Sequence, residues 1–266
     1  MGILNRLQTY MKWFTTDPIG FIVYLLYFAV TITLALTLHE VAHGYVAFRC
    51  GDPTAKMMGR LSLDPRKHLD PLGTICLVFL GFGWAKPVPV NPRNFDDYRR
   101  DDFLVSIAGI VVNLTLFLLS LSLAVGFNGL LWKPEVIAAN GGAKEFLVSN
   151  GIGFSILYSG QGAEFVQYMR YPWVQYIQRF LLMFGSINLS LAVFNFLPIP
   201  PLDGFHIFND ILLKGRLTLD RKMFQIMQIV LMVLIFSGAL TGVLSTVIRA
   251  VENGVLNVLL MCVGQA

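Results

Sequence analysis

Residues 19–48 read IGFIVYLLYFAVTITLALTLHEVAHGYVAF, and the fold class follows from this run. Its length of about 30 apolar residues exceeds the roughly 20 that cross a bilayer as a helix. Near its end stands HEVAH, residues 39–43, which is an HExxH sequence. Residues four apart lie on one helix face, so His39 and His43 can bind one Zn²⁺, while Glu40 can take a proton from water. The run therefore predicts a membrane-spanning helix that carries a metal site.

The depth of the histidines in this run argues against an incidental motif. Residues 44–48 are uncharged, and Arg49 carries the first charge after His43. His39 therefore lies about ten residues, or roughly 15 Å along a helix, from that charge. An ionisable residue near the bilayer centre costs on the order of 3 kcal/mol on insertion scales. We therefore interpret these polar residues as functional.

The composition supports a membrane protein. Hydrophobic residues make up 55% of the chain and charged residues 14%, against roughly 25% charged in an average soluble domain. Residues 103–127, 173–197 and 223–248 are further apolar runs long enough to span. Residues 72–82 would reach only about 17 Å as a helix, so we expect them to enter the membrane and return. The prediction is an all-α polytopic protein with about four transmembrane helices and a re-entrant loop.

The net charge of +4 reflects membrane orientation rather than nucleic-acid binding. Basic residues gather in 49–102 and again after residue 197, and the positive-inside rule makes both connections cytoplasmic. The connection 128–172 has balanced charge, so we expect it to be external. No nucleic-acid partner is expected.

These patterns divide the chain into three parts. Residues 1–16 show helical spacing of apolar residues opposite basic ones, which predicts an amphipathic helix lying in the membrane interface. Residues 17–210 form the predicted core, which contains the metal site. Residues 211–266 form a C-terminal transmembrane helix and tail.

A third ligand must come from outside the first span, because a catalytic zinc has three protein ligands and an open position. The longer pattern HExxHxxGxxH would need Gly and His where this chain has Val46 and Arg49. Asp203 is the best candidate. It follows the prolines that end the 173–197 helix, and the single span 103–127 brings it to the same face of the membrane. Without the two histidines, Asp203 before a glycine would be read as a turn.

Together these residues resemble the site-2 protease family of intramembrane metalloproteases. HEVAH matches the family's HExxH, and NFLPIPPLDG at residues 195–204 matches its NxxPxPxLDG. GIVVN at residues 109–113 is similar to its GxxxN on the intervening helix. The agreement runs from about residue 36 to residue 204, and the chain resembles a short form without a PDZ or CBS domain.

The resemblance implies one Zn²⁺ per chain, bound by His39, His43 and Asp203, with Glu40 as the catalytic base. It implies an endopeptidase that hydrolyses bonds in or near transmembrane segments of membrane proteins, as in regulated intramembrane proteolysis. The implied partners are a substrate helix and the lipid bilayer, and a homo-oligomer is compatible with them. The implied location is a prokaryotic cell membrane, with the active site facing the cytoplasm.

The resemblance also assigns residues around the metal. Asn113 is a candidate for holding the substrate backbone or the oxyanion, and an interhelical hydrogen bond is an equal alternative. Gly81 and Gly83 resemble a glycine pair in the re-entrant loop of other members. Residues 59–63 or 86–90 could form a small β element whose edge accepts an unwound substrate.

Two other interpretations of the chain remain open at this point. A binding module or transporter could hold zinc without hydrolysis, although Glu40, which need not bind metal, favours an enzyme. A structural membrane protein would bind no metal. His206 is interpreted as a boundary residue and His68 as part of the adjoining loop, rather than as ligands.

Overall fold

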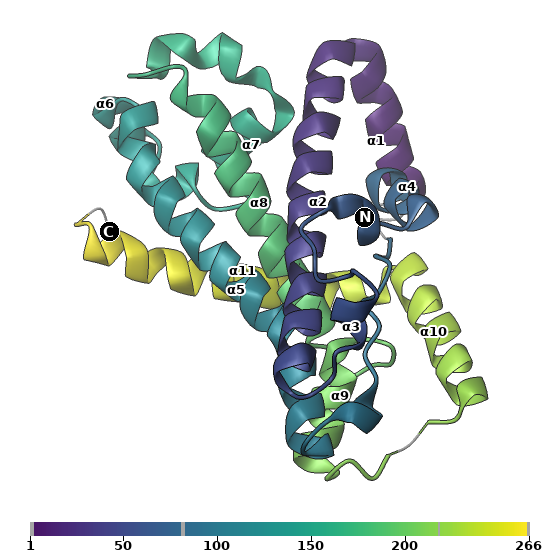
Figure 1. Cartoon of the computed structure of the whole chain (residues 1–266). Coiled ribbons are helices and arrows are strands. Elements are labelled where there is room, and N and C mark those ends of the chain that lie inside the picture. The colour runs from purple at the N-terminus through teal and green to yellow at the C-terminus, as the bar shows by residue number, and fades with distance from the viewer. Residues whose placement is uncertain (1–2, 81–82, 218, 265–266) are drawn as a thin grey trace. The chain divides into compact units, whose positions relative to one another are not determined.

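The computed structural model describes residues 3–80, 83–217 and 219–264, and it is mostly helical (Figure 1). Within these ranges there is no β-strand, so the β element expected near the site is not confirmed. The two isolated β-bridges pair Leu69 with Ala85 and Trp132 with Met169.

In the described part of the chain, four helices are long and apolar enough to cross a membrane: α2 (Pro18–Arg49), α5 (Tyr98–Leu131), α8 (Val174–Asn195) and α11 (Ala239–Cys262). A helix satisfies its backbone hydrogen bonds internally, which is the condition for crossing a bilayer. Helices α2, α5 and α8 coincide with the predicted apolar runs 19–48, 103–127 and 173–197, to within a few residues at the ends. The four helices support a multi-pass membrane protein.

The last predicted span is wrong in its bounds. Residues 223–248 were expected to form one helix, but α10 (Arg221–Phe236) and α11 meet within them. Gly238 separates the two helices with a φ of 75°, a left-handed conformation that glycine adopts at no steric cost. At 1.5 Å per residue, α10 reaches about 24 Å, which is shorter than the roughly 30 Å hydrocarbon core. A single Ser-Gly pair inside an apolar run was too weak a signal to reveal this break.

Two shorter predictions concern α1 (Ile3–Thr16) and α4 (Pro71–Leu80). Helix α1 forms, as the periodicity of residues 1–16 predicted, and its position in the membrane interface stays a prediction. Helix α4 reaches about 15 Å, which is too short to cross a bilayer. That it enters the membrane and returns to the same side stays a prediction.

The other helices are α3 (Thr54–Met57), α6 (Pro134–Ala139), α7 (Ile152–Ser159) and α9 (Asp203–Leu212), with 3-10 helices at Pro65–Lys67, Pro92–Asn94, Ala143–Phe146 and Gln161–Tyr168.

The chain forms two compact units. Unit 1 comprises Met1–Arg6, Thr33–Leu114 and Ser190–Leu244. Its core joins α5, α8 and α9 through the buried residues Ile110, Ala192 and Ile207. All the predicted metal ligands belong to unit 1.

Unit 2 comprises Leu7–Ile32, Thr115–Leu189 and Ser245–Ala266. Within it, α11 is attached to the connection between α5 and α8 by a buried carboxylate. Glu252 is 5% exposed, and it accepts hydrogen bonds from Ser149 N at 3.1 Å and Ser149 Oγ at 2.6 Å. Hydrogen bonds to a charged group are among the stronger ones, so this contact stabilises the C-terminal helix.

Replacing Glu252 with Ala is expected to lower the melting temperature of the detergent-solubilised protein, because two donors of the half-buried Ser149 lose their acceptor. The loss should correspond to about 2–4 kcal/mol. Arg249→Ala, an exposed site on the same helix, is the control and should melt like the wild type. Equal melting temperatures for Glu252→Ala and Arg249→Ala would contradict the assignment.

Candidate metal centre

The HExxH sequence lies in the last third of α2, where regular helical geometry brings its two histidines together. Nε2 of His39 and Nε2 of His43 are 3.0 Å apart, and the ring centroids are separated by 4.6 Å. His39 is 6% exposed. The pair therefore offers two nitrogen ligands at one buried point.

Asp203 brings a third potential ligand atom to the same point, where the sequence predicted one. Its Oδ2 lies 3.4 Å from Nε2 of each histidine. Asp203 is the first residue of α9, and the following Gly204 lets this helix start fold back onto the end of α8. A Cβ at Gly204 would overlap the carbonyl oxygens of Phe196 and Leu197. Among the described residues, this is the only group of three or more potential ligands that could hold a metal ion.

The geometry and charge of the three ligands fit zinc. Bonds of about 2.0–2.2 Å in a tetrahedral site place ligand atoms about 3.3–3.6 Å apart, close to the separations found here. Oδ2 of Asp203 is buried and has no hydrogen-bond partner in the described part of the chain. A ligating carboxylate is deprotonated, so an unpaired, buried oxygen of Asp203 suits a bound cation.

The outer nitrogen of His43 is fixed by the backbone of α5. Nδ1 of His43 lies 2.7 Å from the carbonyl oxygen of Val105. A carbonyl oxygen only accepts, so Nδ1 carries the hydrogen and Nε2 keeps its lone pair for a metal. Sequence reasoning missed Val105, because any residue offers the same carbonyl.

Asn113 performs the equivalent task for His39. The carboxamide is fully buried, and its Nδ2 lies 3.2 Å from Nδ1 of His39. Its Oδ1 has no hydrogen-bond partner in the described residues, and a half-turn of the carboxamide exchanges the two atoms. With Oδ1 facing the ring, Asn113 accepts the Nδ1 hydrogen and frees Nε2 for a metal. The structure therefore shows an interhelical hydrogen bond of Asn113, and a role of Asn113 toward the substrate or the oxyanion stays a prediction.

Gly109 allows α5 to approach the histidines this closely. A Cβ at Gly109 would lie 2.5 Å from Nε2 of His43 and 2.6 Å from Nδ1 of His39. Such distances are well inside van der Waals contact, so only glycine fits. The GxxxN spacing thus places a close approach and a hydrogen bond one helical turn apart on the face that meets the metal ligands.

Glu40 lies beside the ligands and is 9% exposed. Its Oε2 accepts a hydrogen bond from the backbone N–H of Val88 at 2.8 Å. Val88 belongs to an extended segment after α4, and its side chain packs where Gly44 leaves space on α2. The sequence motifs did not predict this partner, because the backbone N–H is the same for every residue except proline.

The remaining candidates lie elsewhere or make other contacts. Nε2 of His68 contacts the carbonyl oxygen of Ser62 at 2.7 Å, so this histidine stabilises the loop, as expected. Gly83 approaches α4, where a Cβ would overlap the carbonyl oxygen of Gly73. Gly81 lies outside the described residues. The substrate-binding role of the two glycines stays a prediction.

His206 joins α9 to the start of α5 rather than binding the metal. Its Nδ1 lies 3.0 Å from Oδ2 of Asp102. One turn further along α9, the carbonyl oxygen of Asp210 accepts a hydrogen bond from Nε of Arg99 at 2.8 Å. These contacts hold the helix whose first residue is Asp203.

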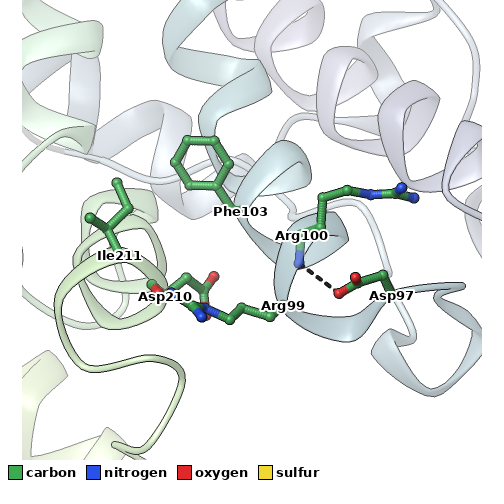
Figure 2. A pocket seen from close by; sticks show the side chains of 6 residues that line it. All are labelled: Asp97, Arg99, Arg100, Phe103, Asp210 and Ile211. Carbon is green, nitrogen blue, oxygen red and sulfur yellow. Dashed lines mark hydrogen bonds between the residues drawn. The ribbon is translucent and has the colours of Figure 1, made fainter.

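A pocket of about 410 Å³ opens beside these contacts (Figure 2). Its lining residues are Asp97, Arg99, Arg100, Phe103, Asp210 and Ile211. No metal ligand is among them, so this pocket is separate from the metal centre.

Acidic neighbours shift the pKa values of two side chains on α9, those of His206 and Asp210. The hydrogen bond to Asp102 raises the pKa of His206 above its ordinary value, although burial opposes the shift. Burial and the neighbouring Asp102 carboxylate raise the pKa of Asp210 to about 6. Both groups therefore hold their protons to a higher pH in the folded protein than in the unfolded chain.

The raised pKa of His206 predicts a pH-dependent stability. Stabilisation by a histidine with a raised pKa is complete below the unfolded value of about 6.5 and is lost as the pH rises through the folded value. His206→Gln should therefore lower the melting temperature more at about pH 6 than at about pH 9. In an Asp102→Asn background the difference between the two pH values should be smaller, because the hydrogen bond to Asp102 is the largest cause of the raised pKa. A loss independent of pH in the wild-type background would contradict this account.

Gly109→Ala is expected to remove most of the bound zinc, because the added methyl group displaces both imidazoles. Zinc per chain would be measured by atomic absorption on the purified protein. Gly126→Ala is the matched control on the same helix, since a Cβ there meets nothing within 4 Å, and it should retain zinc. One zinc per chain in Gly109→Ala would show that the close approach is not required.

Comparisons with known proteins agree with this geometry. The model of the family "Peptidase family M50" matches residues 27–238. The chain is 40% identical over 190 residues to "Putative zinc metalloprotease YwhC" of Bacillus subtilis (strain 168), covering 71% of this chain and 70% of that protein. It is 26% identical over 204 residues to "Putative zinc metalloprotease Rip2" of Mycobacterium tuberculosis (strain H37Rv), covering 73% of this chain and 62% of Rip2. No solved structure matches.

The family match covers most of the chain and includes both parts of the ligand set. It contains the α2 histidines and Asp203, which the structure brings to one point. The fit of these ligands to zinc agrees with the activity named for the relatives. The chain therefore belongs to peptidase family M50 and is a zinc metalloprotease.

Proposed function

We propose that this metalloprotease hydrolyses peptide bonds in or near the transmembrane segments of membrane-protein substrates. The observation that carries the proposal is the position of the metal ligands along a membrane-length helix. His39 lies ten residues before Arg49, where α2 ends, which is roughly 15 Å along the helix. A protease centre at this depth is suited to substrates that lie in the membrane.

The ligands and the base have separate tasks in the proposed reaction. Bound zinc supplies a Lewis acid that polarises a carbonyl and makes water nucleophilic at neutral pH. His39, His43 and Asp203 would hold it. Glu40 takes the proton from the attacking water and can pass it to the leaving amine. The contacts of Val105 and Asn113 keep both Nε2 atoms available to the metal.

The substrate must unwind before it is cleaved. In a helix each carbonyl is hydrogen-bonded within the segment, so an intact transmembrane helix offers no free carbonyl. We therefore expect residues of poor helix propensity close to the bond that is cut. Gly83 lies in the connection that follows α4, and we propose that the glycine pair contacts the unwound substrate.

We infer that the active site faces the cytoplasm. The connections on the side of the ligands carry the basic residues, both between α2 and α5 and between α9 and α10. The connection between α5 and α8 has balanced charge. By the positive-inside rule this distribution supports a cytoplasmic position for Asp203 and the end of α2.

Glu40→Gln is expected to abolish cleavage and to leave zinc bound, because the amide cannot take a proton and Glu40 is not a ligand. Cleavage would be measured as new termini inside transmembrane segments, comparing membrane proteomes of cells that express the wild type or the variant. Glu164→Gln, at an exposed site, is the matched control and should cleave normally.

The same comparison tests the zinc-binding alternative. Undiminished cleavage by zinc-loaded Glu40→Gln would refute the role of Glu40. A zinc-loaded wild type that produces no new termini would instead support a protein that binds zinc without hydrolysing membrane proteins.

A further inference from the structure

The peptide bond that contacts Glu40 is held from both ends. Its N–H, on Val88, donates to Oε2 of Glu40 at 2.8 Å. Its carbonyl oxygen, on Pro87, accepts from Nη2 of Arg60 at 3.1 Å. The same nitrogen donates to the carbonyl oxygen of Lys86 at 2.7 Å. A guanidinium group is therefore separated from the proposed base by one peptide unit.

Arg60 is unusual in its burial and in its partners. It is 9% exposed, and arginine is rarely buried without a partner of opposite charge. The ion pairs found among the described residues do not include Arg60, and its Nε has no hydrogen-bond partner there. The buried charge is thus directed at the two carbonyl oxygens that precede Val88.

Other hydrogen bonds hold the ends of this segment, while the buried side chain of Val88 packs at its centre. The N–H of Lys86 donates to the carbonyl oxygen of His68 at 2.8 Å. At the far end, the N–H of Asn91 donates to Oδ2 of Asp52 at 2.7 Å. Arg60 holds the carbonyl side of the Pro87–Val88 peptide, opposite the N–H that Glu40 accepts from. Its loss should leave both ends of the segment attached.

We propose that Arg60 is a positioning residue for Glu40, acting through the Pro87–Val88 peptide; this inference rests on the proposed function. A charged donor on the carbonyl oxygen polarises the peptide and strengthens its N–H as a donor. It also fixes the direction of that N–H. With Oε2 of Glu40 held, the carboxylate keeps one orientation, in which Oε1 is the oxygen that receives the proton of water.

A role in catalysis differs measurably from a role in folding or in substrate binding. If Arg60 orients Glu40, its replacement lowers kcat and leaves both KM and the zinc content nearly unchanged. If Arg60 shapes a substrate-binding edge, KM changes instead. If it only stabilises the loop, lysine and glutamine at this position differ in melting temperature but not in kcat.

The test uses the full-length protein in detergent, with Arg60→Gln, Arg60→Lys and the control Arg66→Gln. Arg66 lies in the same connection, and its exposed side chain pairs with Asp64. Hydrogen–deuterium exchange of residues 86–90 is measured on zinc-free protein, so this arm does not depend on activity. Zinc per chain, kcat and KM are then measured on a synthetic transmembrane peptide of Leu and Ala interrupted by Gly-Asn-Gly, with a fluorophore and a quencher at its ends.

Arg60→Gln is expected to exchange faster than the wild type at 86–90 and to lose about tenfold or more in kcat, with KM within about twofold. It should still bind one zinc. Arg60→Lys should recover part of kcat, because an ammonium group can donate to one of the two carbonyl oxygens. Arg66→Gln should match the wild type in every measurement.

Two results would overturn the inference. One is unchanged exchange and unchanged kcat in Arg60→Gln; the other is a change confined to KM. A wild type that binds zinc but leaves the peptide uncut would count against the proposed function alone. In that case the exchange measurement still decides whether Arg60 holds the Val88 peptide.

Discussion

Ionisable groups gathered in an apolar environment must satisfy one another, and the organisation of unit 1 follows from this requirement. Two imidazoles and a carboxylate meet with ligand atoms 3.0–3.4 Å apart. An uncompensated charge at such a place costs several kcal/mol, so each group needs a partner or a metal. Bound zinc would meet this need for the inner atoms, and backbone and amide groups meet it for the outer ones.

The outer contacts explain why α5 accompanies α2. Gly109 lets the two helices approach, the carbonyl group of Val105 fixes one imidazole and Asn113 fixes the other. All three lie on α5 within about two helical turns. The GxxxN motif is thus part of the metal site, although neither of its named residues binds the metal.

The connection between α2 and α5 likewise provides a partner for Glu40, the proposed base. Glu40 needs a partner that leaves its second oxygen accessible to water, and a single backbone N–H meets that need. Such a donor works only if its peptide is held still. Asp52 anchors one end of the segment, and burial of Arg60 against two carbonyl oxygens restrains its centre.

Local chemistry and spacing were enough to predict the His39–His43–Asp203 group and three of the four membrane-length helices. HExxH, the proline-ended helix before Asp203 and the apolar runs are properties of contiguous residues. The break at Gly238 escaped prediction, since one glycine in an apolar run is compatible with either outcome. Val105, Val88 and Arg60 escaped it for a different reason. Backbone groups are the same at every position, and a buried arginine looks like a surface one until its distant partners are known. These contacts join residues that are far apart in the chain, so only the tertiary structure shows which groups are partners.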